Sequence, residues 1–163
     1  MSQTPIVRPV SWLNAGVTLG ILAVFLVIGF VLNRSVGVVV GAGLYLALSQ
    51  SLRNVIAQHH RNGVRHSKRK EFERAISEFQ KSAAFFRDHE WIDRFRAITM
   101  LSAAGMRYRE MALVSLGFCY AQIGDGLRAR QSYEQSLIEF PDNEMAKAAL
   151  RLMDAGASVK QEA

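Results

Sequence analysis

The stretch that decides the fold is residues 113–141, which read LVSLGFCYAQIGDGLRARQSYEQSLIEFP. Apolar side chains recur at helical spacing before Gly124 and again after it, and Pro141 closes the second run. Gly124 and Asp125 are typical of a turn between two helices. A small residue, Gly117, stands in the middle of the first helix, where it would let the second helix approach closely. The stretch therefore predicts an antiparallel pair of helices.

This pattern resembles the tetratricopeptide repeat (TPR), which reads W-x2-L-G-x2-Y, then Ala, an aromatic residue four positions later, and a closing Pro. The residues that carry the resemblance are Leu113, Leu116, Gly117, Tyr120, Ala129, Tyr133, Ser136 and Pro141. Leu113 replaces the family's Trp, and Ser136 replaces a small Ala. The resemblance implies close contact of the two helices at Gly117 and Ala129, with the two tyrosine rings filling the space beside them.

A weaker copy of the pattern lies upstream. Its matching residues are Gly63, Ala75 and Phe79, each 54 positions before its counterpart, with His66 in place of Tyr120. Tandem TPR units are 34 residues apart, so about 20 extra residues must be accommodated. Apolar residues at helical spacing predict an additional helix over residues 89–104. A last amphipathic run after Pro141 predicts a helix that caps the array.

Two apolar runs precede the repeats. Residues 15–32 carry no charge, polar residues 33–35 follow, and a second apolar run covers residues 36–48. Because about 20 apolar residues span a bilayer core, we expect a transmembrane hairpin over residues 12–53. The alternative is a cleaved signal peptide, since Arg8 precedes the apolar core, but signal cores usually hold about 7–15 residues.

Small residues are expected to face one another in this hairpin. Folding at Arg34 would place Gly29 at the depth of Gly37 and Gly41. It would also place small residues opposite each other at the far end of the two helices, namely Gly16 and Gly20 near Ala47, Ser49 and Ser51.

Charge is divided unevenly along the chain. Residues 1–70 contain eight Lys and Arg and no Asp or Glu, which gives +8, whereas residues 71–163 carry a net charge of −2. The basic cluster after the second apolar run consists of Arg61, Arg65, Lys68, Arg69 and Lys70. Positive flanks stay inside, so both termini are expected to be cytoplasmic, in a bacterial inner membrane. The cluster is a topology signal or a contact for anionic lipid, and nucleic acid is not expected because no aromatic residues are interleaved with it.

The sequence shows no catalytic or phosphate-binding motif, so an enzyme is not expected and no cofactor is predicted. His59, His60 and His66 cluster in sequence, but no Asp or Glu lies beside them and the neighbouring Arg and Lys would oppose a metal ion. The single cysteine, Cys119, is interpreted as a small buried apolar residue.

The expected architecture is all-α. It comprises a cytoplasmic segment (residues 1–11), the transmembrane hairpin (12–53), a TPR-like array (54–156) and a flexible tail (157–163). By resemblance, the first helix of each pair would line a protein-binding groove with His60, Val64, Ser67, Lys68, Met111, Val114, Phe118 and Gln122. The additional helix could instead fill that groove. The resulting hypotheses are a membrane-anchored adaptor, a self-associating structural protein and an accessory subunit of a membrane complex.

Overall fold

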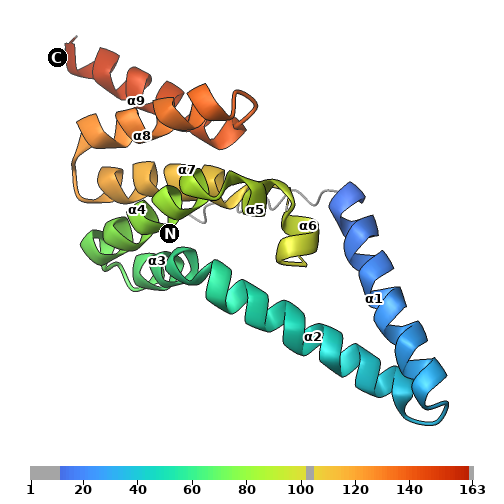
Figure 1. Cartoon of the computed structure of the whole chain (residues 1–163). Coiled ribbons are helices and arrows are strands. Elements are labelled where there is room, and N and C mark those ends of the chain that lie inside the picture. Colours follow the sequence, from blue (N-terminus) through green and yellow to red (C-terminus); the bar gives the residue numbers. More distant parts are fainter. Residues whose placement is uncertain (1–11, 102–104, 162–163) are drawn as a thin grey trace. The chain divides into compact units, whose positions relative to one another are not determined.

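A computed structural model describes residues 12–101 and 105–161, and this part of the chain consists of nine α-helices without a strand (Figure 1). The helices are α1 (Trp12–Leu32), α2 (Gly37–Ile56), α3 (Gln58–Lys68), α4 (Phe72–Asp88), α5 (Glu90–Arg94), α6 (Arg96–Thr99), α7 (Tyr108–Gln122), α8 (Gly126–Glu139) and α9 (Glu144–Gln161). The prediction of an all-α protein is confirmed. The expected N-terminal segment, residues 1–11, lies outside the described residues.

The helices form two compact units that interleave along the chain. The first unit contains α1, α2, α5 and α6. The second contains α3, α4, α7, α8 and α9. The segment between the two helix pairs of the second unit therefore belongs to the first unit.

In the first unit, a short polar turn reverses the chain between α1 and α2. The side chain of Asn33 accepts hydrogen bonds from the backbone N–H groups of Ser35 (2.9 Å) and Val36 (3.2 Å). An Asn that bonds to backbone groups two and three residues ahead stabilises a tight turn and caps the start of the next helix. This explains why the chain reverses where the sequence turns polar.

Close to this turn, α1 and α2 touch through glycine backbones. A methyl group at Gly29 would lie 2.0 Å from the carbonyl oxygen of Gly37, and one at Gly41 would lie 2.4 Å from that of Phe25. Any side chain at these positions would push the helices apart. The predicted meeting of Gly29 with Gly37 and Gly41 is therefore present in the structure.

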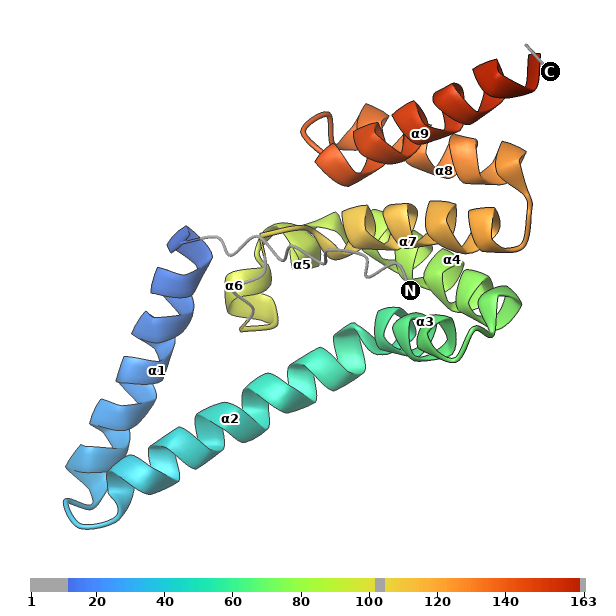
Figure 2. The same ribbon diagram turned by 180° about the vertical axis from the view of Figure 1, so that it is seen from behind.

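Farther from the turn, α1 and α2 diverge (Figures 1 and 2). The rings of Phe25 and Tyr45 pack edge to face with centroids 6.0 Å apart, and the Tyr45 hydroxyl donates to the carbonyl of Thr18 at 3.4 Å. Methyl groups at Gly16 and Gly20 would meet no atom of residues 12–101 or 105–161 within 4 Å. The expected contact of these glycines with small residues of α2 does not form, because the two helices diverge toward this end.

Only α1, among the described helices, is long and apolar enough to cross a membrane. Its 21 residues include an 18-residue window with a mean hydropathy of 2.7, of which 11% is buried. In α2, the polar residues Ser49, Gln50, Ser51, Arg53 and Asn54 lower the apolarity of the C-terminal half. The second membrane span thus rests on the sequence argument alone.

Two segments differ from expectation. Instead of one helix over residues 89–104, the chain forms the short helices α5 and α6 with a break at Phe95, and residues 102–104 lie outside the described part. The C-terminal helix α9 continues through Gly156 to Gln161, over residues expected to form a flexible tail. A single glycine near a helix end costs only about 1 kcal/mol, which does not by itself stop a helix.

Candidate protein-binding surface

The second unit contains the same helix-pair geometry twice. Gly63 of α3 faces the ring of Phe79 in α4, and Gly117 of α7 faces the ring of Tyr133 in α8; in both pairs a methyl group on the glycine would come within 2.7 Å of the ring. The two pairs are offset by 54 residues. A ring lying flat against a helix backbone requires the absence of a Cβ, which gives each glycine its packing role.

The turns inside the two pairs are also equivalent. Lys70 and Gly124 both have positive φ angles, 61° and 82°. In the first turn, the N–H of Lys70 bonds to the carbonyl of Ser67 and that of Glu71 to the carbonyl of His66. The second turn has the same two bonds, Gly124 to Ala121 and Asp125 to Tyr120. This pattern is the Schellman ending of a helix, with a left-handed residue just after it.

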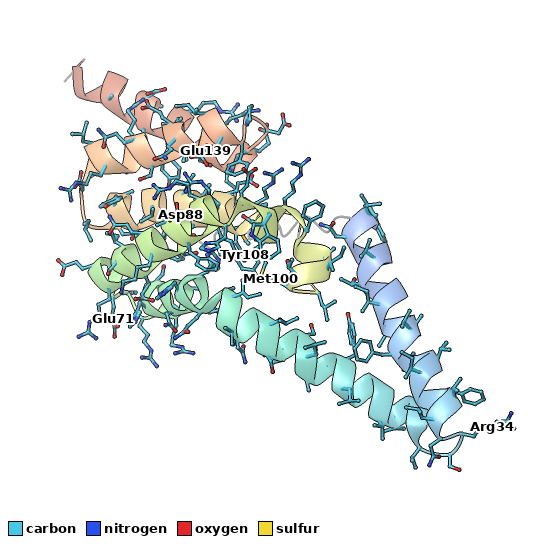
Figure 3. The ribbon with its side chains drawn as sticks, in the orientation of Figure 1. Arg34, Glu71, Asp88, Met100, Tyr108 and Glu139 are labelled. Carbon is cyan, nitrogen blue, oxygen red and sulfur yellow. The ribbon has the colours of Figure 1, made fainter. Side chains whose placement is uncertain are left out.

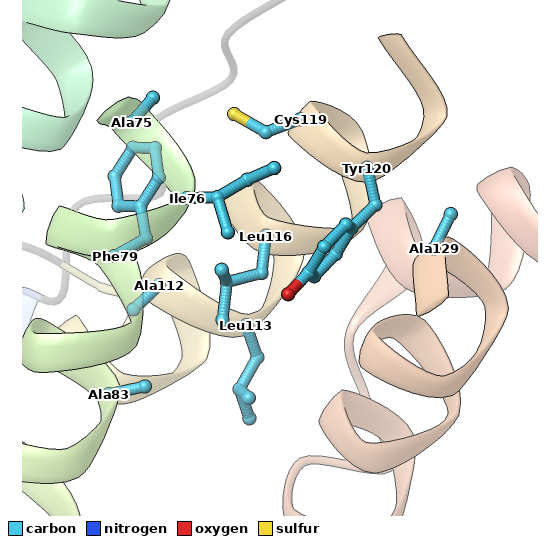
Figure 4. Close-up of a cluster of buried hydrophobic side chains, with 10 residues drawn as sticks. All are labelled: Ala75, Ile76, Phe79, Ala83, Ala112, Leu113, Leu116, Cys119, Tyr120 and Ala129. Atoms are coloured by element: carbon cyan, nitrogen blue, oxygen red, sulfur yellow. The ribbon is translucent and has the colours of Figure 1, made fainter. Parts of the chain in front are cut away.

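Apolar side chains of α4 and α7 join the two pairs into one core (Figure 4). The cluster contains Ala75, Ile76, Phe79 and Ala83 of α4, Ala112, Leu113, Leu116, Cys119 and Tyr120 of α7, and Ala129 of α8. Ala75 and Ala129, which occupy equivalent positions, are both fully buried. Burial raises the pKa of the Cys119 thiol, against a hydrogen bond with Ser67 that lowers it.

The one departure in the C-terminal half of the repeat pattern is explained by α9. Ser136, in place of a small Ala, is fully buried, and its hydroxyl accepts a hydrogen bond from the Asn143 side chain at 3.3 Å. The same Asn143 amide donates to Glu110 (3.0 Å), while its oxygen accepts from the N–H of Ala146 and so caps α9. The serine therefore belongs to a polar connection between α7, α8 and α9.

His60 was predicted to line the groove, but the structure places it in the interior. Only 8% of His60 is exposed, and its ring lies edge to face against Phe79 (5.5 Å) and Tyr108 (5.3 Å). Tyr108, labelled in Figure 3, also stacks on Phe86 at 5.1 Å. Residues 89–107, the inserted segment, separate the two helix pairs, and Tyr108 follows them. Sequence spacing alone does not show that Tyr108 covers this face of α3.

The other predicted groove residues remain at or near the surface of α3 and α7. Lys68 and Gln122 are exposed, whereas Val64, Ser67, Met111 and Val114 are half-buried. Phe118 is 36% exposed and packs edge to face on Phe72, with centroids 6.3 Å apart. Val64 of α3 packs against the buried cluster to which α7 contributes, and this contact brings the two helices together. This α3–α7 surface, defined by Val64, Ser67, Lys68, Met111, Val114, Phe118 and Gln122, is apolar at its centre and polar at its ends.

Two histidines of α3 contact carboxylates, one from α4 and one from the turn that precedes α4. Nδ1 of His59 lies 2.9 Å from Glu78, and Nδ1 of His66 lies 2.6 Å from Glu71. Hydrogen bonds from His59 and then Lys81 lower the pKa of Glu78 to about 2, and the bond from His66 lowers that of Glu71. These contacts join α3 to α4 and to the turn between them.

Arg109 is a connecting residue that no sequence pattern indicates. Its guanidinium binds both carboxylate oxygens of Glu139, each at 2.5 Å, and donates to the carbonyl oxygen of Ala83 at 2.6 Å. Although burial raises the pKa of Glu139, the hydrogen bonds and charge of Arg109 leave that pKa below its ordinary value. One side chain of α7 thus holds both α4 and α8.

A groove of about 400 Å³ opens between α4, α7 and α8. Its polar lining includes Arg87, Arg109, Arg128, Gln80, Gln131 and Gln135, and its apolar floor includes Leu113, Leu116 and Tyr120. Arg87 pairs with Asp88 and Arg128 with Asp125, so the arginines already have acidic neighbours within the chain. The groove offers hydrogen-bond donors around an apolar floor and lies apart from the predicted α3–α7 surface.

Within the described part of the chain, no group of three or more His, Cys, Asp or Glu side chains is arranged to hold a metal ion. Comparison of the chain with protein-family models, with curated proteins and with solved structures gave no match.

Proposed function

We propose that this protein is a membrane-anchored adaptor, in which a TPR-like helical array recruits another protein at the cytoplasmic face. The observation that carries the proposal is the repeated geometry of α3–α4 and α7–α8, including the glycine–ring contacts and the left-handed turns. Stacked helix pairs of this kind present continuous surfaces for partners rather than enclosed active sites. The apolar helix α1 supplies the anchor.

The α3–α7 surface is the proposed recognition site. Its apolar centre, around Phe118, suits the apolar face of an amphipathic helix, and Lys68 and Gln122 supply polar contacts at its edges. His60 is not part of the site because its ring is buried. Fixing the array to a membrane raises its effective concentration near membrane-bound partners, so modest affinity would suffice.

The basic cluster is proposed to contact anionic lipid. Arg61, Arg65, Lys68, Arg69 and Lys70 are all exposed. None of the five forms an ion pair with another side chain that the structure describes. Each such charge near an anionic surface contributes about 1 kcal/mol. The cluster would also keep the array, and with it both termini, on the cytoplasmic side of a bacterial inner membrane, with α2 as a second span.

The adaptor proposal is tested by crosslinking the full-length protein in its native membranes and purifying it. Wild type is compared with Phe118→Glu, and with Ile138→Glu as a matched control, because Ile138 is 81% exposed on α8 and outside the proposed site. We expect a distinct protein to be recovered with wild type and Ile138→Glu but lost with Phe118→Glu. Equal recovery with all three chains would remove the α3–α7 surface from the proposal.

Self-association of the membrane helices is the second candidate function. Gly16 and Gly20 are four residues apart on α1, and a methyl group on either glycine would meet no atom of the part of the chain that the structure describes within 4 Å. Such spacing allows close contact with another helix in lipid. Sedimentation of the full-length protein in mild detergent should then show an oligomer that Gly16→Leu with Gly20→Leu dissociates and that Val24→Leu leaves intact. A monomer in all cases would contradict self-association.

A further inference from the structure

The inserted segment carries large apolar side chains on its surface. Trp91 is 60% exposed, Phe95 53% and Ile98 60%. They lie within eight residues of one another, on the short helices α5 and α6 and at the break between them. Ala97, Met100 and Leu101 of the same segment are buried, so the segment already has an inward face. We call Trp91, Phe95 and Ile98 the apolar patch; large apolar side chains exposed so close together in the chain are a candidate interaction site.

Several polar groups of this segment are paired within the segment itself. The N–H of Phe95 bonds to the carbonyl of Trp91, and the N–H of Ile98 to that of Phe95. The Thr99 hydroxyl donates to the carbonyls of Ile92 (2.8 Å) and Phe95 (3.1 Å). Backbone groups that are already paired can enter an apolar environment at lower cost.

The position of the segment within its unit indicates which apolar environment it meets. α5 and α6 belong to the same compact unit as α1, and α6 contacts α1. Figures 1 and 2 show α6 beside the N-terminal half of that helix. Trp12, 87% exposed, stands at the same end of α1. Tryptophans with an apolar ring and a polar N–H concentrate at the boundary between membrane and water.

A charged side chain, that of Arg94, lies beside these apolar residues. The guanidinium of Arg94 lies 6.0 Å from the centre of the Phe95 ring, beside the apolar patch, and is itself exposed. A cation next to an inserted aromatic ring is well placed to reach lipid phosphate groups. Short amphipathic segments with this combination of Trp, Phe and Arg lie in the plane of the membrane surface rather than across it.

We infer that α5 and α6 form an interfacial element that lies on the bilayer surface beside α1 and inserts Trp91, Phe95 and Ile98 among the lipid headgroups. The inference rests on the proposed membrane anchoring and extends it. The array would then be attached to the membrane at two places along the chain, before α3 and between α4 and α7. The contact of α6 with α1, the proposed membrane helix, favours lipid over a protein as the occupant of this patch.

The two tryptophans of the chain allow a direct test in full-length protein. Trp12→Phe leaves Trp91 as the reporter, and Trp91→Phe leaves Trp12. Both variants are reconstituted into vesicles of phosphatidylethanolamine and phosphatidylglycerol that contain lipids brominated at shallow or deep acyl positions. We expect emission from Trp91 to be lost with shallow bromines, retained with deep ones, and protected from iodide in the water.

The outcomes separate this inference from the membrane anchor itself. If bromolipids quench Trp12 while Trp91 is quenched only by iodide, α1 is anchored and the interfacial role of α5 and α6 is wrong. If bromolipids quench neither tryptophan, the anchor fails as well. Protection of Trp91 from both quenchers would mean that protein covers the patch, which also overturns the inference. As a further check, Phe95→Gln with Ile98→Gln should increase the access of iodide to Trp91, and Ile138→Gln should not.

Discussion

At the scale of single residues, the backbone of Lys70 carries an avoidable strain. It adopts the left-handed conformation that glycine adopts at the equivalent position, Gly124. That conformation costs an L-residue roughly 1–2 kcal/mol, offset partly by the greater freedom of glycine in the unfolded chain.

We therefore expect Lys70→Gly to stabilise the second unit by about 0.5–1 kcal/mol, measured by thermal unfolding of the full-length protein in detergent. Lys68→Gly is the matched control, because it removes the same charge from the last turn of α3. It should destabilise by about 1 kcal/mol, since glycine is unfavourable within a helix. Equal effects of the two changes would show that charge rather than backbone geometry is responsible.

The contact between Gly117 and Tyr133 leads to a prediction of the opposite sign. The ring lies where even a methyl group would come within 2.7 Å, so Gly117→Ala should destabilise by roughly 1–3 kcal/mol despite the better helix propensity of alanine. Gly126→Ala, in open space at the start of α8, should be neutral or stabilising. A stable Gly117→Ala variant would mean that the two helices are not in close contact there.

At the scale of elements, α3 is bound to α4 by ionisable contacts. The pKa of Glu78 lies at about 2 in the folded protein against an ordinary 4.5. A lowered pKa stabilises the folded state above pH 4.5, and this contribution is lost as the pH falls toward 2. Because 45% of the His59 side chain is exposed, solvent screens part of the interaction.

Lowering the pH through this range should thus reduce the melting temperature of the second unit more in wild type than in Glu78→Gln. Circular dichroism followed during heating at a series of pH values measures the difference. Parallel pH profiles for the two proteins would show that Glu78 does not contribute through its charge.

The connection of α4, α7 and α8 through Arg109 gives an element-scale prediction. Arg109→Met leaves Glu139 and the Ala83 carbonyl without their donor, and hydrogen bonds to charged groups contribute about 1.5–3 kcal/mol, so a destabilisation of about that size is expected. Arg130→Met removes the exposed pair between α8 and Asp154 and should cost clearly less. Urea unfolding of the two variants compares the effects, and equal losses would contradict the connecting role.

At the scale of the whole molecule, the proposed topology is tested by placing single thiols in a Cys119→Ser background. If α1 and α2 both cross the membrane, Ser35→Cys in the turn should react with a membrane-impermeant maleimide added to intact spheroplasts. Glu73→Cys in the second unit should react only after lysis. Labelling of Ser35→Cys only after lysis would mean that α1 and α2 do not carry the turn across the membrane.

Sequence patterns predicted the parts of this molecule that depend on near neighbours. The helices α7 and α8 follow from the spacing of Gly117, Tyr133 and Pro141, and the contact of Gly29 with Gly37 follows from symmetry about a short turn. Each depends on residues a few turns apart along one helix or across one reversal of the chain, where periodicity is informative.

Features that depend on distant segments were not predictable. His60 is buried by Tyr108, which lies 48 positions further along the chain, and Arg109 finds Glu139 after a further reversal. The acidic partner of His59, Glu78, comes from α4, 19 positions further along the chain. Helical spacing within the inserted segment predicted one helix, but the chain breaks at Phe95. Local spacing cannot decide between one helix and two short ones, because tertiary packing overrides helix propensity.

The buried position of the only cysteine has a practical consequence. Cys119 is fully buried in the core of the second unit, and burial raises the pKa of its thiol, so it reacts with a thiol reagent only when the core opens. The rate at which Cys119 of the natural protein is labelled therefore measures how often the core opens. Labelling needs no mutation, and under the proposed adaptor role a bound partner that covers the second unit should slow it.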